Sequence, residues 1–248
     1  MKCSLCAAEN SPGSRLCKTC GALLSDKKEG SISSAETVDH AKPFLPRGFL
    51  FADRYEIIEV LGTGGMGVVY RVHDTKIDDE ITLKVLKPGI ASEKKTIERF
   101  RNELRLARKI SHKNVCRMFD LNEGQDSIYI TMEYIPGQDL RGLIRQTGRL
   151  TPQKAVSIAI QLAQGLAEAH RESIIHRDLK PGNVMIDREG NAKILDFGIA
   201  RSLDAKVLTG VGTLIGTPEY MAPEQVDGKT PDKRTDIYSM GVILFEML

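Results

Sequence analysis

The chain has 248 residues, enough for one sizeable domain and a small additional module. Hydrophobic residues make up 41% of it and charged residues 27%, which is ordinary for a globular protein. The net charge is only +2, so the overall balance does not favour nucleic-acid or membrane binding. The sequence contains no apolar run long enough to span a bilayer, and Met1-Lys2-Cys3 begins no secretory signal. We therefore expect a cytoplasmic protein.

Four of the five cysteines lie within the first twenty residues, as the pairs Cys3-x-x-Cys6 and Cys17-x-x-Cys20. Four thiolates in two such pairs suit a tetrahedral zinc ion. So short a segment cannot bury a core, and bound metal would supply its folding energy. Two disulfides or a redox-active pair are the alternatives that the spacing leaves open. The segment resembles bacterial zinc-ribbon modules, and we expect a Zn²⁺ site within residues 1–24.

Residues 25–54 differ in composition from the rest of the chain. Ser25 to Lys42 is polar and serine-rich, which is typical of a linker without a core of its own. Phe44-Leu45 and Phe49-Leu50-Phe51 are more apolar, and we expect them to pack against the next domain. The fifth cysteine, Cys116, lies in an apolar run and is predicted to be a buried thiol.

A glycine-rich hairpin is predicted near the start of the folded domain. Residues 55–61 and 68–72 have the composition of two strands, joined by Gly62-x-Gly64-x-x-Gly67. Glycines at this spacing let main-chain amides approach phosphate without a Cβ atom in the way. The segment after the glycines is a strand rather than a helix, which argues against a dinucleotide-binding domain.

Further elements are predicted along the chain. We expect a strand over 81–86 that carries Lys84, a helix from Ser92 to about Ile110 that carries Glu103, and a strand over 127–134. A short helix is predicted over 139–146, and a longer one opens at Thr151-Pro152, a capping hydroxyl followed by proline. The buried face of the longer helix is predicted to comprise Ala155, Val156, Ala159, Ile160, Ala163, Leu166 and Ala167.

A dense set of polar residues comes after that helix. His176-Arg177-Asp178-Leu179-Lys180-Pro181-Gly182-Asn183 places a carboxylate, an ammonium and a carboxamide close together, and Asp196-Phe197-Gly198 adds a second carboxylate. Asp178 is suited to orient the proton of an attacking hydroxyl, and Lys180 to neutralise charge on a transferred phosphoryl group. Asn183 and Asp196 offer oxygen ligands for Mg²⁺.

These motifs resemble those of the protein kinase family. The match covers the catalytic loop, the Asp-Phe-Gly motif, the glycine-rich hairpin and the hinge-like stretch Met132-Glu133-Tyr134-Ile135. The resemblance implies an α+β, two-lobed protein kinase-like fold over residues 55–248, with a β-rich N-lobe to about 134 and an incomplete helical C-lobe from about 135. The pattern is most similar to bacterial serine/threonine kinases of the Hanks type.

The resemblance also implies a nucleotide site for ATP with Mg²⁺ or Mn²⁺. Lys84, paired with Glu103, would hold the phosphates, and Met132 would be the gatekeeper beside adenine. The other implied nucleotide-binding residues are Leu61, Gly62, Gly64, Gly67, Val69, Glu133, Ile135, Asn183 and Asp196. One departure is Thr82, where the family usually has alanine against adenine.

Regulation and substrate class are implied by the same resemblance. Arg177 beside Asp178 is typical of kinases activated by phosphorylation of the activation segment, and the candidate sites are Thr209 and Thr213. Thr217 is implied as the threonine that contacts the catalytic residues. Lys180 and Ala222-Pro223-Glu224 indicate serine or threonine in protein substrates. A kinase homodimer for autophosphorylation in trans is the expected assembly.

The last eight residues, 241–248, are apolar on nearly every face, which predicts a helix buried inside a larger domain. We therefore expect a truncated domain, with membrane anchoring open beyond it. Three other functions compete with the kinase. They are a scaffold or pseudokinase that recruits partners through the zinc ribbon, a zinc-dependent nucleic-acid binder, and a kinase for small molecules. The complete catalytic set favours a protein kinase.

Overall fold

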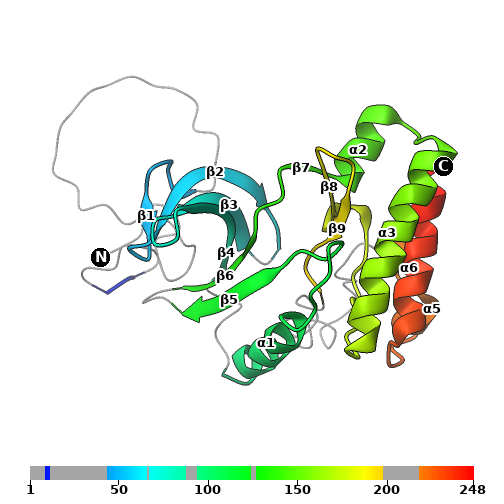
Figure 1. Cartoon of the computed structure of the whole chain (residues 1–248). Helices are drawn as coiled ribbons and strands as arrows, with labels where there is room; N and C mark the ends of the chain where they lie inside the picture. Colours follow the sequence, from blue (N-terminus) through cyan, green and yellow to red (C-terminus); the bar gives the residue numbers. More distant parts are fainter. Residues whose placement is uncertain (1–8, 12–43, 66, 88–93, 124–126, 198–217) are drawn as a thin grey trace, which may run out of the picture. The chain divides into compact units, whose positions relative to one another are not determined.

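The computed structural model describes residues 9–11, 44–65, 67–87, 94–123, 127–197 and 218–248 (Figure 1). The chain divides into two compact units, one of residues 1–93 with 120–131 and the other of residues 94–119 with 132–248. Within the described residues no helix is long and apolar enough to cross a membrane. The four N-terminal cysteines lie outside the described residues, so the zinc ribbon stays a prediction.

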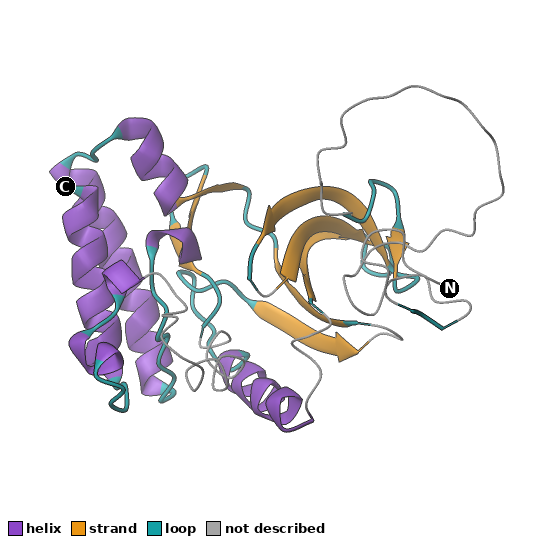
Figure 2. Cartoon of the chain, turned by 180° about the vertical axis from the view of Figure 1, so that it is seen from behind, coloured by secondary structure: helices purple, strands orange, loops and turns teal. Residues whose placement is uncertain are grey.

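The first unit is built on a sheet that Figure 2 shows to be curled. The sheet has six strands in the order β1-β2-β3-β4-β6-β5. Its strands are β1 (Leu50–Phe51), β2 (Tyr55–Thr63), β3 (Gly67–Asp74), β4 (Asp79–Leu86), β5 (Met118–Glu123) and β6 (Ile128–Glu133). Strands β2 and β3 form the predicted glycine-rich hairpin, and β4 pairs antiparallel with β3 over the full length of both strands. The predicted strands are therefore confirmed, with β4 starting two residues early.

The core of this unit lies on one face of the sheet. Because side chains alternate along a strand, Tyr70 and Val72 of β3 and Ile81 and Leu83 of β4 all point into it. Leu45 and Phe51, upstream of the predicted domain start at Tyr55, are buried as well. The main-chain N–H of Leu45 donates to the Tyr70 hydroxyl at 3.2 Å, and Phe51 packs edge-on against Tyr129 at 5.1 Å. The expected packing of this lead-in segment is confirmed at Leu45 and Phe51, whereas Phe44 and Leu50 are exposed.

One partly buried ion pair joins β3 to the turn before β2. The Arg54 guanidinium donates to both carboxylate oxygens of Asp74, at 2.8 and 2.6 Å, and the Asp74 side chain is 1% exposed. Burial acts to raise the pKa of Asp74, but the bonds from Arg54 and from the Lys76 main chain outweigh it and hold the pKa below its usual value.

We expect Asp74→Asn to lower the free energy of unfolding by about 2 kcal/mol at pH 7, because a charge-assisted pair is lost. A lowered folded-state pKa means that the contribution of Asp74 is complete above the unfolded value and is lost as pH falls through the folded one. Denaturant unfolding at pH 7 and at lower pH should therefore show the difference shrinking on acidification. Asp53→Asn, at an exposed position, is the matched control, and an equal loss in both variants would contradict the prediction.

The second unit is mainly helical. Its helices are α1 (Lys94–Ala107), α2 (Leu140–Thr147), α3 (Pro152–Arg171), α5 (Pro223–Val226) and α6 (Lys233–Met247), with 3₁₀ turns η2 (Pro181–Asn183) and η4 (Pro218–Tyr220). Strands β7 (Gly137–Asp139), β8 (Val184–Asp187) and β9 (Ala192–Ile194) form a second, antiparallel sheet. Figures 1 and 2 both show α3 and α6 side by side.

Two helices start at the residues that the sequence indicates. The Asp139 carboxylate caps α2 by accepting from the Gly142 N–H at 2.8 Å, and Gly148 ends that helix with a positive φ of 75°. The Thr151 hydroxyl accepts from the Lys154 N–H at 3.4 Å, with Pro152 at the first helical position. The predicted short and long helices are confirmed, the first shifted by one residue at both ends.

The predicted buried face of α3 is partly wrong. Ala155 and Leu166 are buried, but Val156 is 51% and Ile160 53% exposed, and Ala163 and Ala167 are also exposed. The buried positions are Ala155, Ile158, Leu162, Gly165, Leu166 and Ala169. These residues recur at helical spacing and form a buried face that is rotated about the helix axis from the predicted one. The rotation arises because α3 packs against both α6 and β9.

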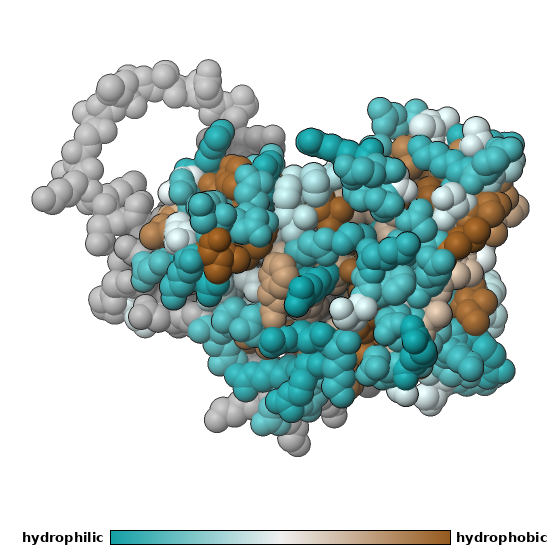
Figure 3. Space-filling view, viewed as in Figure 1, coloured by the Kyte–Doolittle hydropathy of each residue, from teal (hydrophilic) through white to brown (hydrophobic). Residues whose placement is uncertain are grey.

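Helix α6 is not buried on every face in this structure. Ile243 and Met247 are fully buried, whereas Phe245 is 84% and Ile237 52% exposed. Figure 3 shows hydrophobic surface at the edge that α3 and α6 form. The helix is anchored to the start of α3 through the Leu150 N–H, which donates to the Met247 carbonyl at 2.8 Å.

Candidate active site

The glycine-rich hairpin uses its glycines in two ways. A Cβ atom on Gly67 would lie 2.1 Å from the Val85 carbonyl oxygen, so this position needs glycine for the close approach of β3 to β4. Gly62 and Gly64 have open space around the corresponding point. The turn is closed by the Gly64 N–H, which donates to the Gly67 carbonyl at 2.9 Å. The open side at Gly62 and Gly64 leaves room for a ligand to approach the main chain.

Lys84 lies on β4 directly opposite Val69 of β3, and Thr82 lies two residues earlier on the same face. Both Lys84 and Thr82 are 7% exposed. Leu61, near the end of β2, is 44% exposed. The resemblance assigns several residues of the first unit to nucleotide binding, and the sheet places them on three neighbouring strands, β2, β3 and β4, and on the turn between β2 and β3.

The catalytic-loop residues come together in the second unit. The Lys180 ammonium donates to Asp178 Oδ2 at 2.7 Å, and the Asn183 amide donates to the Asp178 carbonyl at 2.8 Å and to its Oδ2 at 3.2 Å. All three side chains are partly exposed. With its Nδ2 used in this way, Asn183 keeps its amide oxygen for another ligand.

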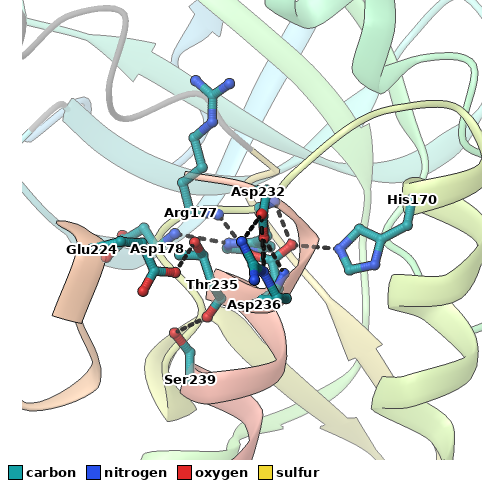
Figure 4. A network of polar contacts seen from close by, with 10 residues as sticks. His170, Arg177, Asp178, Glu224, Asp232, Thr235, Asp236 and Ser239 are labelled. Atoms are coloured by element: carbon teal, nitrogen blue, oxygen red, sulfur yellow. Dashed lines mark hydrogen bonds and ion pairs between the residues drawn. The ribbon is translucent and has the colours of Figure 1, made fainter. Parts of the chain in front are cut away.

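The loop is held by a buried carboxylate that the sequence patterns did not single out (Figure 4). Asp236, at the start of α6, is fully buried. It accepts from the main-chain N–H groups of His176 at 2.9 Å and Arg177 at 2.8 Å, and its Oδ2 lies 2.7 Å from His170 Nε2. The available signal was an aspartate just ahead of the apolar part of this helix, because a charge that becomes buried requires partners.

Arg177 has an uncommon main-chain conformation between these anchors. Its φ of 68° lies in the left-handed region, which costs a non-glycine residue about 1–3 kcal/mol. Asp236 accepts from its N–H, and the Gln225 side chain donates to its carbonyl at 2.8 Å. The Arg177 Nε is buried and has no hydrogen-bond partner among the described residues. A buried donor without a partner is costly, so an acceptor placed beside the Arg177 Nε would stabilise it.

The Asp-Phe-Gly motif packs directly against the catalytic loop. The Phe197 ring is 4.8 Å from the His176 ring, and both residues are buried. His176 Nε2 lies 2.8 Å from the Leu195 carbonyl, which only accepts, and Nδ1 lies 3.3 Å from the Asp178 N–H, which only donates. The contacts therefore specify the neutral tautomer protonated at Nε2. Asp196, between these residues, has a positive φ of 53°.

A small hollow of about 10 Å³ adjoins Asp196 and Phe197 and is also lined by Met132 and Cys116. Cys116 is partly buried rather than fully so, yet burial and the nearby Glu133 and Asp196 carboxylates raise the pKa of its thiol. Met132 and Ile135 are buried, whereas Glu133 is partly exposed. Glu133 is fixed to the neighbouring strand, since its N–H donates to the Arg117 carbonyl at 2.9 Å.

Glu103 lies on α1 in the second unit. Its Oε2 is buried and has no hydrogen-bond partner among the described residues. A buried carboxylate oxygen without a donor is costly, so a cationic side chain beside it would stabilise it. The pairing of Glu103 with Lys84 stays a prediction. Thr209, Thr213 and Thr217 lie outside the described residues.

The segment after residue 217 is fastened to α6. The Ser239 hydroxyl donates to the Tyr220 carbonyl at 2.8 Å, and the Thr235 hydroxyl donates to Glu224 Oε1 at 2.6 Å. The Tyr220 hydroxyl bonds to Glu246, and burial together with this carboxylate raises the pKa of Tyr220. The Ala-Pro-Glu motif and the catalytic loop therefore share α6 as their support.

Comparison with known proteins decides the family. A family model described as a protein kinase domain matches residues 55–248. The chain belongs to the protein kinase family. The kinase domain is 40% identical over 201 residues to serine/threonine-protein kinase PrkC of Bacillus subtilis, which covers 81% of this chain and 31% of PrkC. It is 39% identical over 206 residues to the probable serine/threonine-protein kinase PknB of Corynebacterium glutamicum, covering 81% of this chain and 32% of that protein.

The kinase domain also resembles solved structures. It aligns with the crystal structure of the Mycobacterium tuberculosis PknI kinase domain at a TM-score of 0.67 and 28% identity, covering 82% of this chain and 75% of that chain. The predicted α+β protein kinase fold and its bacterial type are therefore confirmed. The chain spans about a third of the length of the curated relatives it matches.

Proposed function

We propose that the chain is a protein serine/threonine kinase that transfers the γ-phosphoryl group of ATP to serine and threonine hydroxyls. The observation that carries this proposal is the catalytic loop, in which Asp178 is bonded to both Lys180 and Asn183. A carboxylate held beside an ammonium suits a reaction that depends on positioning and charge stabilisation. Relatives about 40% identical are named serine/threonine-protein kinases, which supports the same substrate class.

Each residue of the loop has a role that its contacts allow. Asp178 orients the acceptor hydroxyl and takes its proton, while Lys180 offsets the charge of the transferred group. Asn183 has its amide oxygen available because Nδ2 is bonded to Asp178. This oxygen and the Asp196 carboxylate are hard ligands that fit Mg²⁺. When bound, Mg²⁺ supplies neutralising charge to the polyphosphate.

The remaining nucleotide contacts follow the family pattern. We assign the phosphates to the hairpin at Gly62, Gly64 and Gly67 and to Lys84 with Glu103. Adenine is assigned to Leu61, Val69, Met132 and the main chain of Glu133 and Ile135. Thr82 adds a hydroxyl to the adenine-facing strand, where the family usually has a methyl group.

Regulation by phosphorylation of Thr209 or Thr213 is supported by Arg177, whose buried Nε has no partner among the described residues. A phosphate would supply charge-assisted bonds to this guanidinium and favour one state of the loop. Thr217 is assigned to contact Asp178 and Lys180. Three further parts of the proposal rest on the sequence patterns alone. They are autophosphorylation between two copies, a cytoplasmic location, and a Zn²⁺ site at Cys3, Cys6, Cys17 and Cys20.

Incubation of the chain with ATP labelled at the γ-phosphate, Mg²⁺ and a mixture of serine, threonine and tyrosine peptides tests this function. We expect label on serine and threonine, and its loss in Asp196→Asn or on chelation of the metal. Glu189→Gln, at an exposed position, is the control and should transfer normally. Label on tyrosine would contradict the substrate class. ATP binding without any transfer would favour the scaffold.

A further inference from the structure

Positive charge is concentrated on α1 and the segment after it. Residues 94–117 contain nine lysines and arginines but only two glutamates, whereas the whole chain has a net charge of only +2. Figure 3 shows hydrophilic surface where α1 lies. The proposed kinase chemistry uses none of these cations, so the concentration of charge calls for another explanation.

A hollow of about 420 Å³ opens beside this segment, with all its lining residues in the second unit. Its apolar lining includes Ile110 and Val115, which are buried, and the partly buried Phe119. Its charged lining includes Lys113 and Arg117, which are exposed, and Lys193, which is partly exposed. We call this hollow the α1–β5 groove. It combines an apolar floor with a cationic rim.

Two cationic side chains of the groove, Lys113 and Arg117, have no carboxylate partner among the described residues. Glu133 is the one carboxylate in the lining, and it is engaged by the Lys193 ammonium and by the Arg117 main-chain N–H. The Lys113 and Arg117 side chains have no bonded partner in the part of the chain that the structure describes. His112, also in the lining, has its pKa lowered by burial and by the nearby positive charges of Lys113 and Arg171. The groove therefore presents a positive rim.

We propose that the α1–β5 groove docks an acidic segment of the protein substrate. Aspartate or glutamate side chains pair with Lys113 and Arg117, and one apolar side chain enters over Ile110 and Val115. The proposal rests on the kinase function proposed above, because it names how that enzyme selects its protein substrates. No lining residue belongs to the catalytic loop, and Glu133 is assigned to adenine through its main chain rather than its side chain. Docking therefore acts on substrate affinity rather than on the chemical step.

An acidic peptide fits these features better than nucleic acid does. Single-stranded nucleic acid needs several aromatic faces for base stacking, and Phe119 is the one aromatic residue in the lining. A groove with an apolar floor and two cations on its rim matches one apolar side chain flanked by carboxylates. Docking at a second point raises the effective concentration of the acceptor hydroxyl at the active site.

Binding is tested first, without catalysis. The probe is a fluorescent synthetic peptide in which glutamates flank a single leucine, measured by anisotropy against the chain. We expect Lys113→Glu with Arg117→Glu to weaken binding about tenfold or more, since two attractive charges become repulsive. The matched control carries Arg145→Glu with Lys154→Glu, two exposed positions outside the groove, and should bind as the parent does. Thermal unfolding verifies that both double variants are folded.

Phosphorylation is tested second, with a threonine peptide that carries either the glutamate–leucine tail or a serine–glycine tail of equal length. We expect the acidic tail to lower KM about tenfold in the parent and in the control, and to have no effect in the groove variant, with kcat unchanged throughout. If neither peptide is phosphorylated but the difference in peptide binding persists, the proposed kinase function is wrong and the proposed docking groove is still supported. Equal loss of binding in the control variant, or competition by a uridine oligonucleotide as strong as by the peptide, would overturn the proposal.

Discussion

Asp178→Asn is expected to lower kcat for phosphoryl transfer about 10³-fold, the scale of losing a positioned general base. The substitution keeps the shape of the side chain and leaves the Asn183 bond to the residue 178 carbonyl in place. The amide oxygen can also still accept from Lys180. What is lost is the negative charge that we propose receives the hydroxyl proton, so the dissociation constant for ATP should stay within about twofold.

Steady-state kinetics with a threonine peptide, together with nucleotide binding measured separately, checks this result. Asp227→Asn is the matched control, because Asp227 forms an exposed ion pair with Lys229 and such pairs contribute little. An Asp178→Asn enzyme with unchanged kcat would show that another group takes the proton. A parallel loss of ATP binding would indicate damage to the loop rather than to the chemistry.

Asp236→Asn is expected to lower kcat about 10²-fold, although this side chain is buried behind the loop. Its two oxygens accept from His176 N–H, Arg177 N–H and His170, and a carboxamide must turn its NH₂ toward at least one of these donors. The loop then relaxes from the strained conformation at Arg177, and a displacement of about 1 Å suffices for a loss of this size.

Asp232→Asn on the same helix is the control for Asp236→Asn. Asp232 caps α6 through the Arg234 N–H at 2.8 Å, and asparagine caps a helix equally well. Both variants are compared for kcat, for the KM of ATP and for unfolding free energy. A positioning role predicts a fall in kcat at temperatures where Asp236→Asn remains folded. If kcat falls only in proportion to the fraction of unfolded protein, Asp236 stabilises the fold and does not position the loop.

Local chemistry in the sequence predicted most of the fold and a loop whose polar residues lie together. Glycine spacing indicated the β2–β3 hairpin, and Thr151-Pro152 placed the start of α3, because such signals depend on neighbours in the chain. The order of Asp178, Lys180 and Asn183 predicted residues that meet in space, since they occupy one short loop. The family match then confirmed the fold that these motifs had implied.

What the sequence did not reveal depends on contacts between distant residues. The buried face of α3 is set by two neighbours, α6 and β9, so the apolar pattern alone misplaced Val156 and Ile160. Asp236 lies 60 residues beyond His176, and no local pattern connects the two. Only packing shows that this carboxylate is the support of the catalytic loop.

The dependence of the catalytic loop on Asp236 has a consequence for synthesis of the protein. A nascent chain that has emerged only as far as β9 contains every residue of the loop but lacks the carboxylate that orders it. His176 and Arg177 must wait for α6 before their N–H groups find partners, and long-range contacts of this kind form late. We therefore expect the polypeptide to reach the native geometry of this loop only after α6 has left the ribosome.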